Sequence, residues 1–102
     1  MARTQATQAE AEKVIDNGGV VIYWRPGCPF CERLDSGLGE TGDQATWVNI
    51  WEDETAEAFV KSVNDGNAVV PTVTTSEKSF VASSPKAPKI VSLMIEKSEK
   101  QA

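Results

Sequence analysis

Two cysteines, Cys28 and Cys31, are the residues whose type and spacing most directly indicate chemistry. They form a Cys-x-x-Cys motif, in which one thiolate can attack a disulfide and the other thiol can then resolve the mixed disulfide. A tetrahedral zinc site needs further ligands, and the chain has no other cysteine and no histidine to supply them. We therefore expect a redox pair and no metal site.

The motif stands where a strand gives way to a helix. Residues 20–24 form a continuous apolar run between a Gly-Gly and a Pro-Gly pair, which is typical of a central parallel strand buried on both faces. After it, Cys31, Leu34 and Leu38 recur at helical spacing, and Pro29 suits the first turn of a helix. The two cysteines thus straddle a predicted helix N-terminus.

That position suggests a different role for each thiol. Free N–H groups and the helix dipole favour a thiolate and lower its pKa, which makes Cys28 the expected nucleophile. Cys31 lies one turn further on, less exposed but able to attack a mixed disulfide on Cys28. The alternatives for the pair are a structural disulfide or two inert core thiols.

Composition bounds the class of protein. The chain has 102 residues, 40% of them hydrophobic, so we expect one soluble domain over residues 1–102, with residues 1–6 disordered. A net charge of −5 offers no basic surface to nucleic acid or an anionic membrane. The sequence has no membrane-spanning apolar run and no signal-peptide core, which predicts a cytoplasmic protein. In that reducing compartment a cysteine pair is more often catalytic than structural.

Caps and apolar spacing predict the next helices and strands. Thr7 and Glu10 have capping-box spacing at the start of a short first helix, which ends at 17–18. Residues 46–51 are rich in tryptophan, valine and isoleucine and indicate a second strand. Asp53 can cap the helix that follows. The apolar face of that helix is Ala56, Phe59, Val60 and Val63.

A hairpin and a last helix complete the chain. Residues 72–75 and 79–82 form two short β-rich runs around a polar turn, and the last helix begins near 84–85 or 87–88. Its predicted buried residues are Ile90, Val91, Met94 and Ile95. The alternation of strands and helices predicts an α/β domain that contains a right-handed βαβ unit.

Residues 23–31, Tyr-Trp-Arg-Pro-Gly-Cys-Pro-Phe-Cys, and the later Val-Pro-Thr at 70–72 resemble the glutaredoxins of the thioredoxin superfamily. The segment 48–73 is more closely similar to the mycoredoxins, which are glutaredoxin-like enzymes of mycothiol-using bacteria. The resemblance covers about residues 20–93. It implies a thioredoxin fold, with a four-stranded mixed sheet flanked by helices and, here, a short extra helix at the N-terminus.

The resemblance also implies an activity. It points to a thiol–disulfide oxidoreductase that reduces mixed disulfides between client proteins and a low-molecular-weight thiol, mycothiol rather than glutathione, as a monomer without a bound cofactor. Thioredoxins place a buried aspartate beneath their dithiol, and residues 20–24 have no acid, which favours glutaredoxin chemistry. The alternatives are a dithiol electron donor to ribonucleotide reductase, recharged by thioredoxin reductase, and a scaffold for an iron–sulfur cluster shared between two chains.

The same resemblance implies a substrate site around the cysteines. Arg25 stands where glutaredoxins often carry lysine, and its charge would support the thiolate or attract an anionic substrate; the alternative is a solvated surface arginine. Pro29 and Phe30, between the cysteines, belong to this site. Val70-Pro71 takes the position of the superfamily's cis-proline, where the Val70 backbone pairs with an extended substrate disulfide.

Three residues bear on the choice of thiol. Glutaredoxins commonly hold glutathione with a Gly-Gly pair and an acidic residue after the hairpin, and residues 80–85 have neither. Ser83 and Ser84 are candidates to hydrogen-bond the head group of a different thiol; the alternative is a helix N-cap before Pro85. Trp51 either lines the substrate groove or packs in the core or its rim, and we expect packing.

Overall fold

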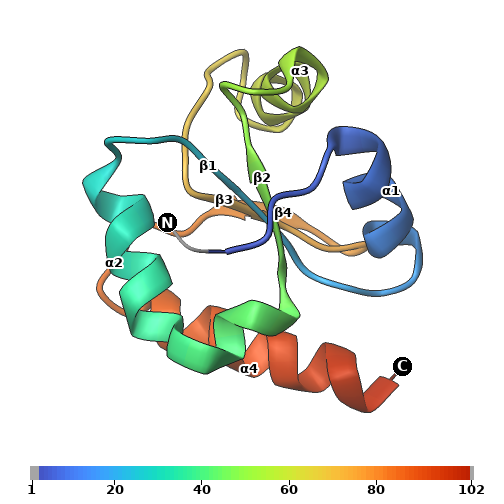
Figure 1. Ribbon diagram of the computed structural model, residues 1–102, viewed down its shortest axis with the longest axis vertical. Coiled ribbons are helices and arrows are strands. Elements are labelled where there is room, and N and C mark those ends of the chain that lie inside the picture. The colour runs from blue at the N-terminus through green and yellow to red at the C-terminus, as the bar shows by residue number, and fades with distance from the viewer. Residues whose placement is uncertain (1–2, 102) are drawn as a thin grey trace.

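The computed structural model describes residues 3–101, in which a four-stranded sheet is covered by helices on both faces (Figure 1). Helices α2 and α4 lie on one face, and α1 and α3 lie on the other. The elements in chain order are α1 Gln8–Asp16, β1 Val21–Trp24, α2 Pro29–Leu38, the 3-10 helix η1 Gly39–Gln44, β2 Thr46–Asn49, α3 Glu54–Val63, β3 Thr72–Thr74, β4 Ser79–Val81 and α4 Ala87–Gln101.

The strand order is β2-β1-β3-β4, and the sheet is mixed. Strand β1 pairs in parallel with β2 and antiparallel with β3, and β3 pairs antiparallel with β4. Because Trp24 at the end of β1 lies opposite Asn49 at the end of β2, both parallel strands finish at one edge of the sheet. The β1–α2 loop and the β2–α3 turn therefore meet at that edge, which is where the cysteine pair lies. This is the predicted four-stranded mixed sheet, with its central apolar strand at β1.

The packing of α2 against α4 brings their backbones close together. Leu34, Val91 and Ile95 are buried in this layer. A Cβ atom on Gly37 would lie 2.5 Å from the Cβ of Pro88, so the crossing of the two helices requires a glycine at that position. The close contact holds the C-terminal end of α2 against the first turn of α4.

The N-terminal segment is attached to the edge of β2. Gln5 forms an isolated parallel bridge with Trp47, and the Ala6 N–H donates to the Trp47 carbonyl oxygen over 2.9 Å. Arg3 is held by Asp35 and Asp43 at 2.7 and 2.5 Å. The prediction of a disordered segment over 1–6 is therefore wrong for residues 3–6, and residues 1 and 2 lie outside the described part of the chain.

Helix α1 has the predicted cap. The Thr7 hydroxyl accepts the Glu10 N–H, and the Glu10 carboxylate accepts the Thr7 N–H. Helix α3 begins after Asp53, whose carboxylate accepts the N–H groups of Thr55 and Ala56. Among the described residues, no helix is long and apolar enough to cross a membrane.

Several predicted boundaries and faces differ from the structure. Helix α4 begins at Ala87 and buries Ala87, Val91 and Ile95, every fourth residue, so Ile90 faces away from this stripe and is 44% exposed. Its predicted burial is wrong, and Met94 is only partly buried. Val63 is exposed because it is the last residue of α3. The predicted strand over 46–51 ends at Asn49, where the chain turns.

Candidate active site

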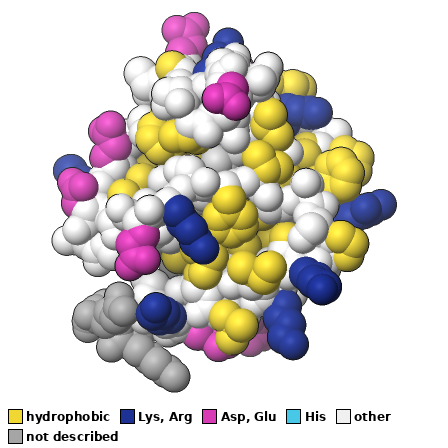
Figure 2. Space-filling model, turned by 180° about the vertical axis from the view of Figure 1, so that it is seen from behind, with side chains coloured by type: hydrophobic (Ala, Val, Ile, Leu, Met, Phe, Trp, Pro, Cys, Tyr) yellow, Lys and Arg dark blue, Asp and Glu magenta, His cyan; other side chains and the backbone are white. Residues whose placement is uncertain are grey.

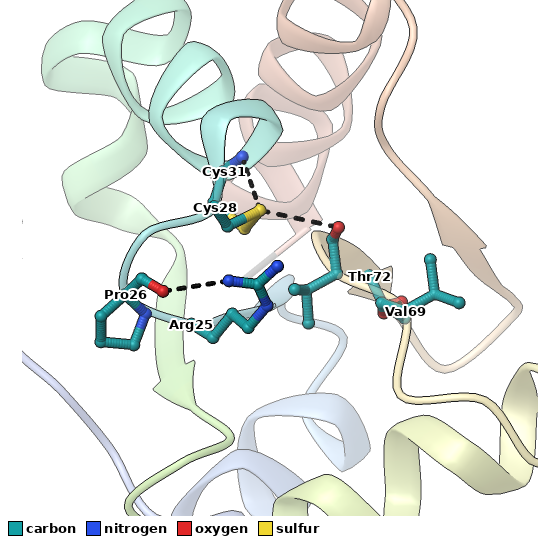
Figure 3. Close-up of a disulfide and its surroundings, with 7 residues drawn as sticks. Arg25, Pro26, Cys28, Cys31, Val69 and Thr72 are labelled. Carbon is teal, nitrogen blue, oxygen red and sulfur yellow. Dashed lines mark hydrogen bonds between the residues drawn. A yellow bond between two sulfur atoms is a disulfide. The ribbon is translucent and has the colours of Figure 1, made fainter.

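Cys28 is the N-cap residue of α2, and Pro29 occupies the first helical position (Figure 3). The Cys31 N–H donates to the Cys28 sulfur over 3.2 Å, and the Glu32 N–H donates to the Cys28 carbonyl oxygen over 3.1 Å. A thiolate at this position accepts a backbone N–H and lies at the positive end of the helix dipole, and both effects favour the ionised form. The geometry therefore supports Cys28 as the nucleophile.

Cys28 and Cys31 are joined as a disulfide, with their Cα atoms 5.2 Å apart. Cys31 has no exposed surface, and Cys28 is 3% exposed. The expected order of exposure is thus correct, although both residues are buried. A substrate sulfur can approach the pair only over the small open surface of Cys28.

The Val70-Pro71 peptide bond is cis, as predicted. The Val70 carbonyl oxygen lies 3.7 Å from the Cys28 sulfur, so the backbone of this loop faces the dithiol across the site (Figure 3). Val70 is 9% exposed, and Pro71 is fully buried. Of the two residues, Val70 is the one whose main chain faces the dithiol, whereas Pro71 is enclosed in the fold.

Thr72 holds the Val70 loop in place. Its hydroxyl donates to the Val69 carbonyl oxygen over 2.7 Å and accepts from the Asn64 side-chain amide over 3.1 Å. The same amide donates to the Val60 carbonyl oxygen near the end of α3 over 3.0 Å. The loop facing Cys28 is therefore tied to α3 by side-chain hydrogen bonds.

A hollow of about 270 Å³ opens on the α2–α4 side of the dithiol. Phe30, which is 45% exposed, lines it together with Ser83 and Ser84. Its other lining residues are Arg33, Leu34, Ala82, Pro85 and Pro88. Figure 2 shows hydrophobic side chains next to Lys and Arg side chains on the side of the molecule where α2 lies. The hollow thus combines apolar walls with hydroxyl and guanidinium groups, and we refer to it as the serine hollow.

Arg33 was missed by the sequence analysis. Its guanidinium carbon lies 5.5 Å from the centroid of the Phe30 ring. The spacing of three residues between Phe30 and Arg33 places both on one side of a helix, and that signal was available in the sequence.

Ser84 does not have the N-cap role that was its alternative. Helix α4 begins at Ala87, and the Ala87 N–H donates to the main-chain oxygen of Ser84 over 3.0 Å. The Ser84 hydroxyl is therefore not placed next to the first helical residue. Ser84 instead lines the serine hollow.

Arg25 and Trp51 lie on the other flank of the dithiol. Arg25 donates to the Pro26 carbonyl oxygen over 3.1 Å, and its guanidinium carbon is 5.5 Å from the centroid of the Trp51 ring. Trp51 is 62% exposed, so the expectation that it packs in the core or its rim is wrong. The Trp51 N–H donates to the Asn49 side chain over 2.9 Å, which turns the chain out of β2.

Two titratable groups join the N-terminal helix to the sheet and to α3. Burial raises the pKa of Tyr23 to about 12, although the hydroxyl donates to the Gln8 side chain over 2.8 Å. The Gln8 N–H and the Thr55 side chain hold the pKa of Asp53 below its usual value. Both groups are stabilised in their normal charge state at neutral pH.

Comparison with known proteins identifies the family. The glutaredoxin family model matches residues 20–80. Mycoredoxin 1 of Corynebacterium glutamicum, from either of two strains, is 40% identical over 72 residues, which are 71% of this chain and 87% of that protein. A crystal structure of a thioredoxin from Malassezia sympodialis matches with a TM-score of 0.59 and 15% identity, covering 100% of this chain and 96% of that one.

These findings agree with the geometry of the site. The family match spans β1, the cysteine pair and the cis-proline loop, and the thioredoxin likeness supports the fold. A dithiol at a helix N-terminus, facing the backbone beside a cis-proline, is suited to thiol–disulfide exchange. The chain belongs to the glutaredoxin family and is a thiol–disulfide oxidoreductase of the thioredoxin fold.

Proposed function

We propose that this protein reduces mixed disulfides between client proteins and mycothiol, with Cys28 as the attacking thiolate. The observation that carries the proposal is the Cys28 sulfur at the start of α2, 3.2 Å from the Cys31 backbone nitrogen. The similarity to Mycoredoxin 1 supports mycothiol as the thiol. We further propose that it acts as a cytoplasmic monomer on S-thiolated or disulfide-containing proteins.

The reaction consists of two exchanges. The Cys28 thiolate attacks the mycothiol sulfur of the client's mixed disulfide, so that the client leaves as a thiolate and mycothiol stays on Cys28. A second mycothiol thiolate then attacks that adduct, which releases mycothiol disulfide and restores the Cys28 thiolate. Alternatively, Cys31 attacks the adduct and releases mycothiol, forming the Cys28–Cys31 disulfide that the structure contains. Either route delivers two electrons to the client, and in the second route mycothiol or thioredoxin reductase must then reduce the Cys28–Cys31 disulfide before the next turnover.

The surrounding groups are proposed to bind the substrate. The Val70 backbone pairs with the cysteine part of the thiol, beside the cis bond to Pro71. Pro29 starts the helix, and Phe30 supplies an apolar wall to the serine hollow. Arg25 donates hydrogen bonds at the opposite flank.

Mycothiol fits these groups better than glutathione does. Its head group is a sugar derivative that needs hydrogen-bonding partners for hydroxyls, and Ser83 and Ser84 in the serine hollow are such partners. The Gly-Gly pair and the acid that glutaredoxins use for the backbone and amino end of glutathione are absent from residues 80–85. The substitution of small hydroxyl residues for these groups supports a different thiol.

The test is turnover of a mycothiolated client with mycothiol, glutathione or thioredoxin reductase as the reductant, each with wild type, Cys28→Ser and Cys31→Ser. We expect mycothiol to give the highest kcat/KM, Cys28→Ser to be inactive, and Cys31→Ser to keep mycothiol-driven turnover. Equal or better kcat/KM with glutathione would overturn the choice of thiol. Activity with thioredoxin reductase alone would show the dithiol donor instead.

A further inference from the structure

Trp51 is an indole in solvent beside a redox site. Its side chain is 62% exposed, whereas Trp24 and Trp47 are 7% and 1% exposed. The residue is nevertheless held in place by two hydrogen bonds from main-chain N–H groups. The main-chain N–H of Trp51 donates to the Asn49 side chain, and the main-chain N–H of the preceding residue, Ile50, donates to the Trp24 carbonyl oxygen over 3.0 Å. The ring is thus presented to solvent from a defined turn, against Arg25 of the loop that leads to Cys28.

Arg25 connects this indole to the dithiol. It comes three residues before Cys28, in the loop between β1 and α2 that Figure 3 shows leading to the disulfide. Its guanidinium lies over the Trp51 ring at 5.5 Å and has five N–H donors, while its one hydrogen bond among the described residues goes to Pro26. A group attached to Cys28 that extends towards Arg25 can therefore accept hydrogen bonds from the guanidinium and contact the Trp51 ring beside it.

A sugar ring is the ligand that matches this pair of groups. One face of such a ring consists of C–H groups, which stack on an aromatic surface, and its rim carries hydroxyls, which accept hydrogen bonds from a guanidinium. The head group of mycothiol is uncharged, so Arg25 would serve it as a fork of donors and not as a counter-charge. The exposed indole adds the apolar surface that a charged ligand alone would not need.

We propose that Arg25 and Trp51 form a sugar-binding platform that holds one ring of mycothiol while its sulfur is bonded to Cys28. The inference rests on the proposed function and assigns Trp51 as a specificity-determining residue. The serine hollow lies on the other side of the dithiol, lined by Phe30 and the loop before α4. The two surfaces can therefore contact different parts of one head group.

Kinetics with two forms of one client separate sugar binding from client binding. The client is S-thiolated with mycothiol or with N-acetylcysteine, which lacks the sugars. We expect Trp51→Ala to raise KM several-fold for the mycothiol adduct and to leave KM for the N-acetylcysteine adduct unchanged. Trp51→Phe, which keeps an aromatic face, should restore most of the affinity. Leu93→Ala, which removes a comparably exposed apolar side chain from α4, should change neither KM.

A spectroscopic measurement tests the contact without turnover. Cys31→Ser carrying mycothiol as a mixed disulfide on Cys28 should show upfield-shifted sugar C–H protons by NMR, because those protons lie over the indole. The additional Trp51→Ala substitution should abolish the shift. An equal rise in KM for both adducts would assign Trp51 to the client protein and overturn the proposal, as would unshifted sugar protons. If wild type does not turn over the mycothiol adduct, the proposed function fails, and this inference fails with it.

Discussion

Two arginine–tryptophan pairs of similar geometry lie in different regions of this molecule. The guanidinium of Arg3 is 5.1 Å from the Trp47 ring centroid, and that of Arg25 is 5.5 Å from the Trp51 ring centroid. Trp47 is 1% exposed, whereas Trp51 is 62% exposed. The same contact thus occurs once inside the fold and once at the rim of the active site.

The partners of each pair explain the difference. Arg3 donates to the Asp35 and Asp43 carboxylates and to the Gly39 carbonyl oxygen, and the Trp47 indole donates to the Gly42 carbonyl oxygen. The N–H donors of Arg3 are thus occupied within the molecule, and the role of Arg3 is to join the N-terminal segment to α2 and η1. Among the residues that the structure describes, the Arg25–Trp51 pair has one such bond, from the Arg25 side chain to the Pro26 carbonyl oxygen. An arginine over a tryptophan ring therefore does not indicate function by itself. An arginine with unused N–H donors beside a solvent-exposed ring does.

The strongest contrast is expected in stability. Trp47→Ala should lower the free energy of unfolding by about 3–5 kcal/mol, because it leaves a large cavity in the core. Trp51→Ala should change it by less than about 0.5 kcal/mol, because the side chain is mostly in solvent. Urea denaturation of both variants measures the difference. Similar losses for the two would contradict the division into a structural and a functional pair.

The two arginines should show the same contrast in stability, with the larger loss at Arg3. Arg3→Ala should lower the free energy of unfolding by about 2 kcal/mol, because it removes charge-assisted hydrogen bonds from a side chain that is only 10% exposed. Its KM for a mycothiolated client should not change. If Arg3→Ala alters KM while thermal unfolding is unaffected, the N-terminal segment belongs to the substrate site.

Alkaline pH should lower the free energy of unfolding through Tyr23, a buried residue of β1. The pKa of Tyr23 is about 12 in the fold against 10.0 as its ordinary value, so the unfolded chain loses this proton first as pH rises. Stability should therefore be constant below pH 10 on this account and fall by about 1 kcal/mol near pH 11. Comparing wild type with Tyr23→Phe by denaturant titration isolates the effect, since the phenylalanine variant should lack this part of the slope. Equal slopes for the two proteins would exclude Tyr23 as the source.

The smallest effect is expected at Arg25, which is half-buried. Arg25→Ala should leave the melting temperature within experimental error and raise KM for the mycothiolated client a few-fold, because the donors of its guanidinium are lost. Arg25→Lys keeps the charge but not the planar fork, so it should recover little of the affinity. Full recovery by lysine would show that charge and not hydrogen-bond geometry is what the site uses.

The redox centre could be predicted from the sequence because its signals are local. The cysteine spacing, Pro29 and the following apolar stripe define a helix that starts at the motif, and Val70-Pro71 matched a known position in the superfamily. The capping residues Thr7 and Asp53 were also recognisable, because a cap acts within one turn of its helix.

The features that could not be predicted depend on residues far apart in the sequence or on two patterns that compete in one segment. Arg3 contacts residues 32 to 40 positions away, and no local pattern near it indicates order. The strand ending at Asn49 was extended to Trp51, because tryptophan and isoleucine continue a β-like run, whereas the Asn49 side chain forms a turn there. Ile90 has helical spacing with Met94, but the buried stripe of α4 runs through Val91 and Ile95.

The central claim is that Cys28 takes mycothiol from the client. The most direct measurement is intact mass spectrometry of Cys31→Ser after one equivalent of mycothiolated client, followed by peptide mapping. The account predicts one mycothiol on Cys28 and one free client thiol for each adduct formed. A disulfide between Cys28 and the client, or an unmodified Cys28 with the client still mycothiolated, would contradict it.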